Sequence, residues 1–209
     1  VPIGVLVLLA ITYPLALFFG IIGQANPGVA VDSKPSADQI ADNPSKAAAL
    51  AQDGWQLWQK RQFTDAQAKF QQAVQLDPAL ASAWNGLGWA SLNQGNTAPA
   101  QQAFEKAITL EPGHAGAENG LGIIAFQKNK LEQAEQHWLI SATAPGAQAA
   151  WYGLAKLYLS RSQWDQARNY AQKLVDAGNQ DAQPLLDAAN TQTLSPALRR
   201  EIFPLLESA

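Results

Sequence analysis

Three segments of this chain resemble one another at nearly constant spacing, and this repeat limits the possible folds more than any other feature. The segments are WNGLGWASLNQGN at 84–96, ENGLGIIAFQKNK at 118–130 and WYGLAKLYLSRSQ at 151–163, and their starts lie 34 and 33 residues apart. Two further marks keep the same period, because Leu-Asp-Pro ends at Pro78 and Leu-Glu-Pro ends at Pro112. Such a period indicates a stack of similar units, each of which buries its apolar face against the next.

Small and bulky residues occupy fixed places within the repeats, which we number from residues 47, 81, 115 and 148. Positions 8 and 20 are small, and position 24 is aromatic in the first three repeats. The residues are Gly54, Gly88, Gly122 and Ala155 at position 8; Ala66, Ala100, Ala134 and Ala167 at position 20; and Phe70, Phe104, Trp138 and Ala171 at position 24. Two antiparallel helices approach closely only where both carry small residues, and bulky residues fill the space beside the contact. The pattern predicts helix-turn-helix repeats at 47–80, 81–114, 115–147 and 148–180.

The combination of W-x2-L-G, A-x3-F and a closing proline on this period resembles the tetratricopeptide repeat (TPR) family, and in particular bacterial members of it. The resemblance covers residues 47 to about 180 and implies an all-α TPR solenoid of about four repeats that binds other proteins. In the remaining segment, 181–209, we expect two short capping helices at 182–189 and 195–206. Ser195 is a good N-cap for the second of them, and Pro196 suits its first turn.

The N-terminal segment, residues 1–22, contains no charged side chain. As a helix it would extend roughly 33 Å, which matches a bilayer core of about 30 Å. We therefore predict one transmembrane helix at 1–22, followed by a Pro- and Gly-containing linker at 23–46. A secretory signal cleaved near Gly23-Gln24-Ala25 and a buried soluble helix remain alternatives. The acidic flank after this segment favours a TPR domain on the extracytoplasmic side of a bacterial inner membrane.

In the TPR family the first helix of each pair lines a concave groove through positions 2, 5, 9, 12 and 13, and the resemblance implies the same arrangement here. The corresponding candidate protein-binding residues are Trp55, Trp58, Asn85, Trp89, Leu92, Asn93, Asn119, Ile123, Phe126, Gln127, Tyr152, Lys156 and Leu159. These side chains are aromatic, aliphatic or amide, with the single charge of Lys156. They suit an extended peptide or an amphipathic helix better than a chaperone-tail carboxylate, whose recognition requires several Lys or Arg.

A glycine also recurs at position 6, as Gly86, Gly120 and Gly153. A glycine inside a helix costs about 1 kcal/mol relative to alanine. We expect it to permit close contact between successive first helices, and the alternative is contact with the backbone of a partner.

Several classes of function are disfavoured by the composition. The net charge of −3 and the lack of a long Lys/Arg run argue against nucleic-acid binding. The chain has no cysteine, and its two histidines, His114 and His137, have no ligand-spaced neighbours in the sequence. Phosphate-loop and H-E-x-x-H motifs are also missing. We therefore predict neither cofactor nor metal, and no enzymatic activity.

These observations together predict a membrane-anchored TPR scaffold. We expect it to be an accessory, assembly or stabilising subunit of a bacterial respiratory or photosynthetic complex. Its partners would be integral membrane subunits, and residues 1–22 would contact the lipid bilayer. Two alternatives remain open. The chain from Gly54 onward resembles the partner-binding TPR regions of antirepressor-type membrane metallopeptidases, which would make it the sensor part of a signalling protein. After signal cleavage it would instead be a free periplasmic TPR protein.

Overall fold

The structure, a computed structural model, describes the backbone of residues 37–203 and the side chains of residues 43–203. The helices in this range are α1 (Ala37–Gln59), α2 (Phe63–Leu76), α3 (Ala81–Asn93), α4 (Thr97–Leu110), α5 (Ala115–Gln127), α6 (Leu131–Ser141), α7 (Gln148–Ser160), α8 (Trp164–Asp176), the short 3-10 turn η1 (Gln180–Ala182), α9 (Gln183–Thr191) and α10 (Pro196–Ile202). The described part of the chain is thus an all-α array, as the sequence predicted.

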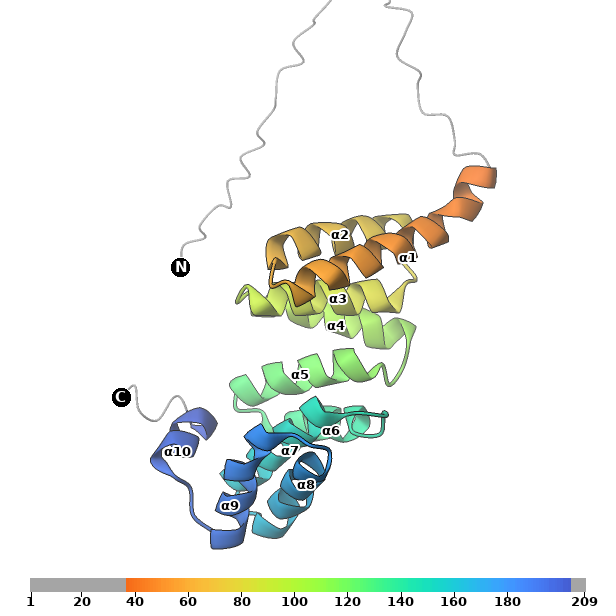
Figure 1. Ribbon diagram of the computed structural model, residues 1–209. Helices are drawn as coiled ribbons and strands as arrows, with labels where there is room; N and C mark the ends of the chain where they lie inside the picture. Colours follow the sequence, from red (N-terminus) through yellow and green to blue (C-terminus); the bar gives the residue numbers. More distant parts are fainter. Residues whose placement is uncertain (1–36, 204–209) are drawn as a thin grey trace, which may run out of the picture. The chain divides into compact units, whose positions relative to one another are not determined.

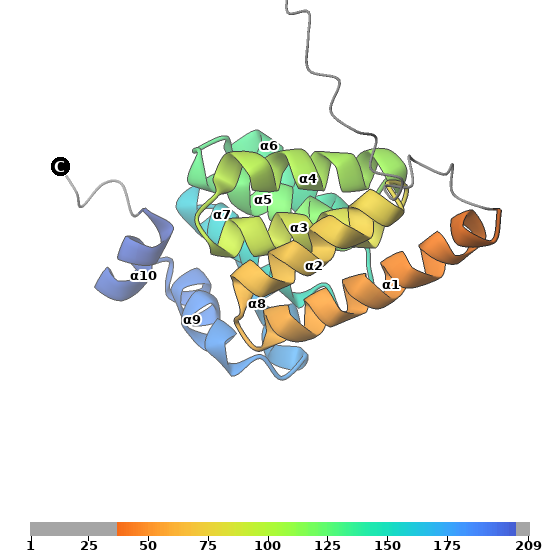
Figure 2. The ribbon, with the colours of Figure 1, turned by 90° about the horizontal axis from the view of Figure 1, so that it is seen from above.

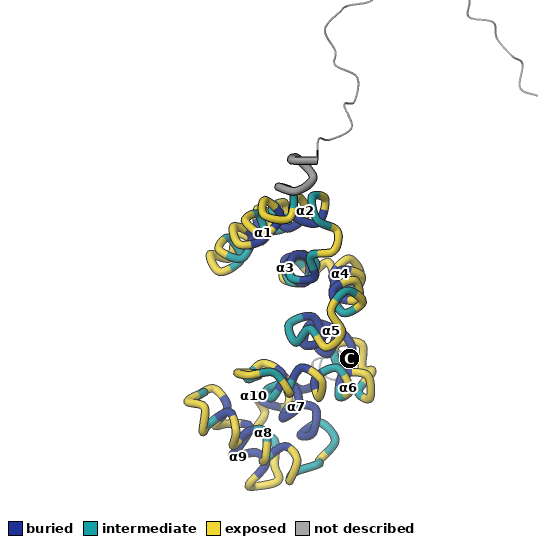
Figure 3. The backbone as a smooth tube through the Cα atoms, turned by 90° about the vertical axis from the view of Figure 1, so that its right-hand side faces the viewer, coloured by how far each residue is buried: buried dark blue, intermediate teal, exposed yellow. Residues whose placement is uncertain are grey.

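Helices α1 to α8 form four antiparallel pairs that stack in chain order (Figure 1). The first helices of successive pairs also pack against one another, since α1 contacts α3, α3 contacts α5 and α5 contacts α7. Helices α9 and α10 lie at the opposite end of the stack from α1 (Figure 1), and the view from above shows α10 to one side of the stacked pairs (Figure 2). Buried residues follow the contacts between neighbouring helices, and the outward-facing turns are exposed (Figure 3).

The aromatic residue at position 24 is the main filler between pairs. Phe70 and Phe104 are fully buried, and Trp138 is 3% exposed. Each ring lies against the position-8 glycine of its own repeat: a Cβ atom at Gly88, for example, would stand 2.5 Å from the Phe104 ring. The alanines at position 20 are fully buried as well. These contacts confirm the predicted alternation of small and bulky residues.

The position-6 glycines have a different role from either of the two expected from the sequence. A Cβ atom at Gly86 would lie 2.2 Å from the ring of Phe70, which belongs to the preceding repeat. Gly120 stands in the same relation to Phe104, and Gly153 to Trp138. The glycines therefore accommodate an aromatic ring from the preceding second helix, and each ring is held between two glycines of consecutive first helices.

The fourth pair has alanine at both position 24 and position 8, where the other pairs have an aromatic residue and a glycine. Position 24 is Ala171, and position 8 is Ala155; both are fully buried. Because the filler is small, the neighbouring first helix can carry a methyl group. The end of the stack is covered instead by α9 and α10, whose Leu185, Leu198 and Ile202 join the core of the last pair. The Ser195 hydroxyl accepts a hydrogen bond from the Leu198 amide at 3.2 Å, so the predicted N-cap is confirmed.

The N-terminal boundary of the helical array differs from the predicted linker. Helix α1 begins at Ala37 and continues through Pro44, so residues 37–46 are helical. The proline and small residues of this stretch indicated a linker. Its Ala, Gln and Lys residues, however, are good helix formers. The predicted transmembrane helix at 1–22 lies outside the described residues. Within residues 37–203, no helix combines the length and apolar character required to cross a membrane.

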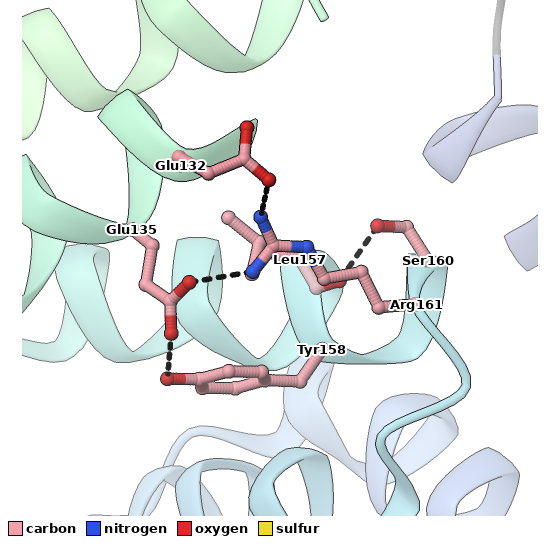
Figure 4. A network of polar contacts seen from close by, with 6 residues as sticks. All are labelled: Glu132, Glu135, Leu157, Tyr158, Ser160 and Arg161. Atoms are coloured by element: carbon pink, nitrogen blue, oxygen red, sulfur yellow. Dashed lines mark hydrogen bonds and ion pairs between the residues drawn. The ribbon is translucent and has the colours of Figure 1, made fainter. Parts of the chain in front are cut away.

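A polar network joins the third pair to the fourth (Figure 4). Arg161, at the end of α7, donates to Glu132 at 2.8 Å and to Glu135 at 2.5 Å, both on α6. The hydroxyl of Tyr158 donates to the other oxygen of Glu135 at 2.7 Å, and its ring stacks on Tyr170 with centroids 5.8 Å apart. Because Tyr158 is only 6% exposed, these bonds fix the junction between the two pairs.

Candidate protein-binding groove

The N-terminal part of the inner layer of first helices carries a row of tryptophans. Trp55 and Trp58 on α1 meet edge to face at 5.8 Å, and Trp58 meets Trp89 of α3 at 6.4 Å. Trp55 also packs on Phe70 and Trp89 on Phe104. All three tryptophans are partly exposed. Each tryptophan therefore packs partly against the core and is partly exposed at the surface of the first-helix layer.

The C-terminal part of this layer encloses a cavity of about 990 Å³ between α5, α7 and α10. The candidate residues that it brings together are Asn119, Ile123, Phe126, Gln127, Tyr152 and Lys156. The repeat pattern does not indicate the opposite wall, which is made by Glu201, Ile202 and Phe203 together with Asp181. These residues lie outside the repeat, so the repeat positions carry no signal for them. A cavity of this size, lined by both apolar and amide groups, matches the dimensions of ligand sites.

The charge of Lys156 is compensated within the chain. Its Nζ lies 3.0 Å from Glu201 Oε1, and the Tyr152 hydroxyl donates to the same oxygen at 3.1 Å. Burial, followed by the charges of Glu201 and Asp181, raises the pKa of Tyr152 to about 12. The groove's single predicted cation is therefore part of an ion pair that ties α10 to α7.

The remaining candidates fall at the edge of the groove or in the core. Leu159 is 1% exposed and belongs to the core, because α9 and α10 cover this end of the stack. Asn93 is exposed and donates to the Trp89 carbonyl of its own helix at 2.8 Å. Leu92 packs, half buried, against the core of the second and third pairs.

The two asparagines at position 5 are more than nine-tenths buried, although the sequence suggested that they face a peptide. The Asn119 side-chain oxygen accepts a hydrogen bond from the Trp138 indole N–H at 3.0 Å. Asn85 has Phe104 in the place of that tryptophan, and a phenyl ring has no N–H to donate. Its Oδ1 is buried without a hydrogen-bond partner in the protein. The amide row is therefore at least partly structural.

One polar pair was not visible in the sequence. Glu118 is buried on α5, and its Oε2 lies 2.7 Å from Nδ1 of His137 on α6. One feature of the sequence does set Glu118 apart. It occupies repeat position 4, where the neighbouring repeats carry Trp84 and Trp151. Within the described part of the chain, no three His, Asp or Glu side chains group as metal ligands would.

The tyrosines predict how stability depends on alkaline pH. Burial is the largest cause that raises the pKa of Tyr152, Tyr158 and Tyr170 above the ordinary value of about 10 in the folded chain, with nearby carboxylates adding to it. The unfolded chain therefore releases these protons first. Their contribution to the free energy of unfolding is complete below about pH 10 and is lost as the pH rises towards about 12.

Urea unfolding at increasing alkaline pH measures this loss. Tyr158→Phe keeps the ring stack and removes the hydroxyl, so this variant should lose less stability between neutral and alkaline pH than the parent protein. Equal losses would show that Tyr158 does not contribute.

Antiparallel helix pairs, stacked so that their first helices line one cavity-bearing face, define a helical-repeat solenoid protein. Proteins of this class use that extended surface to bind other macromolecules.

A family model for the tetratricopeptide repeat matches residues 52–98, 92–139 and 137–182, which together span more than half of the chain. The chain therefore belongs to the TPR family. It is a protein–protein interaction scaffold, and its partners are other proteins.

Solved structures with the same fold include several bacterial-type TPR proteins. PilF of Pseudomonas aeruginosa is 19% identical, with a TM-score of 0.65 over 79% of this chain and 77% of PilF. YrrB, described as a TPR protein with an unusual peptide-binding site, is 17% identical, with a TM-score of 0.56 over 81% of this chain and 88% of YrrB. PilW, described as a widely conserved type IV pilus biogenesis factor, is 16% identical, with a TM-score of 0.55 over 78% of this chain and 87% of PilW. At these identities the likeness is one of fold. A search of the curated proteins found no significant match.

Proposed function

We propose that this chain is a membrane-anchored scaffold that holds a segment of a partner protein in its concave groove. In this proposal it acts by binding, without catalysis, as an accessory or assembly subunit of a bacterial membrane complex such as a respiratory or photosynthetic one. The TPR domain lies on the extracytoplasmic side, tethered by residues 1–22.

The cavity between α5, α7 and α10 is the observation that supports binding through the groove. It is large enough for side chains of a peptide, and Ile123 and Phe126 offer apolar surface beside the exposed amide of Gln127. YrrB, with the same fold, is described as having a peptide-binding site. The uncharged run at 1–22 supports the anchor.

A photo-cross-linking residue at Gln127 tests the use of the groove. Gln127 is exposed and lines the cavity, whereas Gln136 is exposed on α6 and does not line it. In cells that make the intact chain, the Gln127 position should cross-link to a discrete membrane protein and the Gln136 position should not. Equal products from both positions, or none from Gln127, would contradict binding through the groove.

Removal of residues 1–22 tests the anchor and its orientation. The shortened chain should leave the membrane fraction, and its TPR domain should remain helical. A C-terminal phosphatase reporter, which is active only outside the cytoplasm, should be active on the intact chain. A mature N-terminus near Asn26 would instead support the free periplasmic protein.

A further inference from the structure

The mouth of the cavity is more acidic than the first helices alone predict. Its lining contains three charged side chains, and these are Lys156 on α7, Asp181 in η1 and Glu201 on α10. Lys156 is already paired with Glu201 at 3.0 Å. One carboxylate charge therefore remains uncompensated at this site.

Both carboxylates remain accessible to a ligand. The Glu201 side chain is 47% exposed, and its hydrogen bonds to other residues in 43–203 all use Oε1, which leaves Oε2 open within that range. Asp181 is exposed, and its carboxylate bonds to no other side chain among residues 43–203. Both carboxylates line the cavity, and the charge of each helps to raise the pKa of Tyr152.

The walls next to these carboxylates are apolar. Ile123, Phe126 and Leu131 line the cavity from the third pair, and Ile202 and Phe203 line it from the C-terminal end. An apolar side chain placed between these walls would be removed from water on both sides, which is the main source of affinity in such pockets.

We propose that this cavity binds a partner segment in which a bulky apolar side chain stands beside a lysine or arginine. The apolar side chain lies between Phe126 and Phe203, and the basic group is received by Glu201 and Asp181. An acidic residue in the same place meets the two carboxylates and finds Lys156 already occupied. This assignment rests on the proposed function of the groove and specifies the chemistry of its ligand.

Three synthetic peptides of equal length test the assignment by fluorescence anisotropy with the intact chain in detergent. One carries Leu-Lys at its centre, one Leu-Glu and one Gly-Lys. We expect the Leu-Lys peptide to bind most tightly and to weaken as ionic strength rises, because the charges lie at a solvent-exposed rim. Equal affinity for the three peptides, or preference for Leu-Glu, would overturn the proposal.

Matched charge variants locate the basic subsite. Asp181→Asn should weaken binding of Leu-Lys by about two- to five-fold, the range for a partly exposed charge pair. Glu201→Gln should do the same and also improve binding of Leu-Glu, because it frees Lys156. Glu111→Gln makes the same charge change at an exposed site that does not line the cavity, and should leave all three affinities unaltered. Equal effects from all three variants would indicate a general charge effect and overturn the subsite.

A steric block separates this inference from the proposed function. Ala149 is exposed on α7 and lines the cavity, so Ala149→Trp should fill the site while circular dichroism stays unchanged. The variant should lose Leu-Lys binding. If Leu-Lys still binds to it, or if the Gln127 cross-link persists in it at full yield, the partner uses another part of the groove; the inference then fails while the scaffold function stands. If the parent chain, without Ala149→Trp, also gives no cross-link from position 127, both this inference and the proposed use of the groove are overturned.

Discussion

Replacing Phe104 by alanine is expected to lower the free energy of unfolding by about 3–5 kcal/mol, which is the usual cost of deleting a buried phenyl ring. Phe104 is fully buried between the second and third pairs. The backbones of Gly88 and Gly120 hold the ring from both sides, so the helices cannot close the space without moving apart from their other contacts. Urea denaturation followed by circular dichroism measures the loss.

The two glycines should reverse the sign of their effect in that variant. In the parent protein a Cβ atom would lie 2.5 Å from the ring at Gly88 and 2.4 Å at Gly120, so either Gly→Ala change should destabilise by about 1–3 kcal/mol. In the Phe104→Ala background the ring is gone, and alanine is the better helix former by about 1 kcal/mol. Each substitution should then stabilise the protein.

Gly95→Ala is the control for this coupling. A Cβ atom at Gly95 meets nothing within 4 Å, and its cost arises from the positive φ of 80°. That cost should be the same in both backgrounds. If the effects of Gly88→Ala and Gly120→Ala also simply add to that of Phe104→Ala, the ring is not what excludes a side chain there.

The second large effect is expected at the Glu118–His137 pair. His137→Ala should lower the free energy of unfolding by about 2–3 kcal/mol, because it leaves a carboxylate that is 6% exposed without its partner. The value lies below the upper range for buried pairs since the His137 side chain is 29% exposed. Replacing both residues by leucine should cost less than the single change, because no buried polar group is then left unpaired. Thermal and urea unfolding of the three proteins measure this.

His114→Ala serves as the matched control. His114 caps α5 through a long contact of 3.4 Å from the Ala117 amide to Nδ1, so its loss should cost about 1 kcal/mol or less. A cost for His137→Ala no larger than this would show that the Glu118 carboxylate is satisfied in another way, for example by water.

The repeat was predictable because its steric rule is local and is stated several times in the chain. A glycine at position 8 and an aromatic residue at position 24 fit only when two helices cross at that point, and three copies of the pattern agree. The position-6 glycines were recognised in the sequence, but the aromatic ring that each of them contacts was not. The ring that requires each of them belongs to the preceding repeat, and its direction depends on how the pairs are turned relative to each other.

The candidate groove was predictable only in part. Ile123, Phe126, Tyr152 and Lys156 do line one cavity. Leu159 occupies an equally eligible repeat position, yet the C-terminal helices bury it. Whether a residue at a given repeat position can face a ligand depends on which helices cover it. The helices that cover Leu159 lie outside the repeats.

By itself, the sequence determined that this protein is a stack of helix pairs, where the second, third and fourth pairs begin, and which small and aromatic residues lie between them. That information is contained in short segments, because each steric match involves residues less than one repeat apart or in the next repeat. Only the tertiary structure decided that α10 forms one wall of the cavity, that Glu201 neutralises Lys156, and that Glu118 meets His137. These contacts depend on the relative orientation of whole helices, and a pair of charges 45 residues apart has no periodic pattern that would reveal it beforehand.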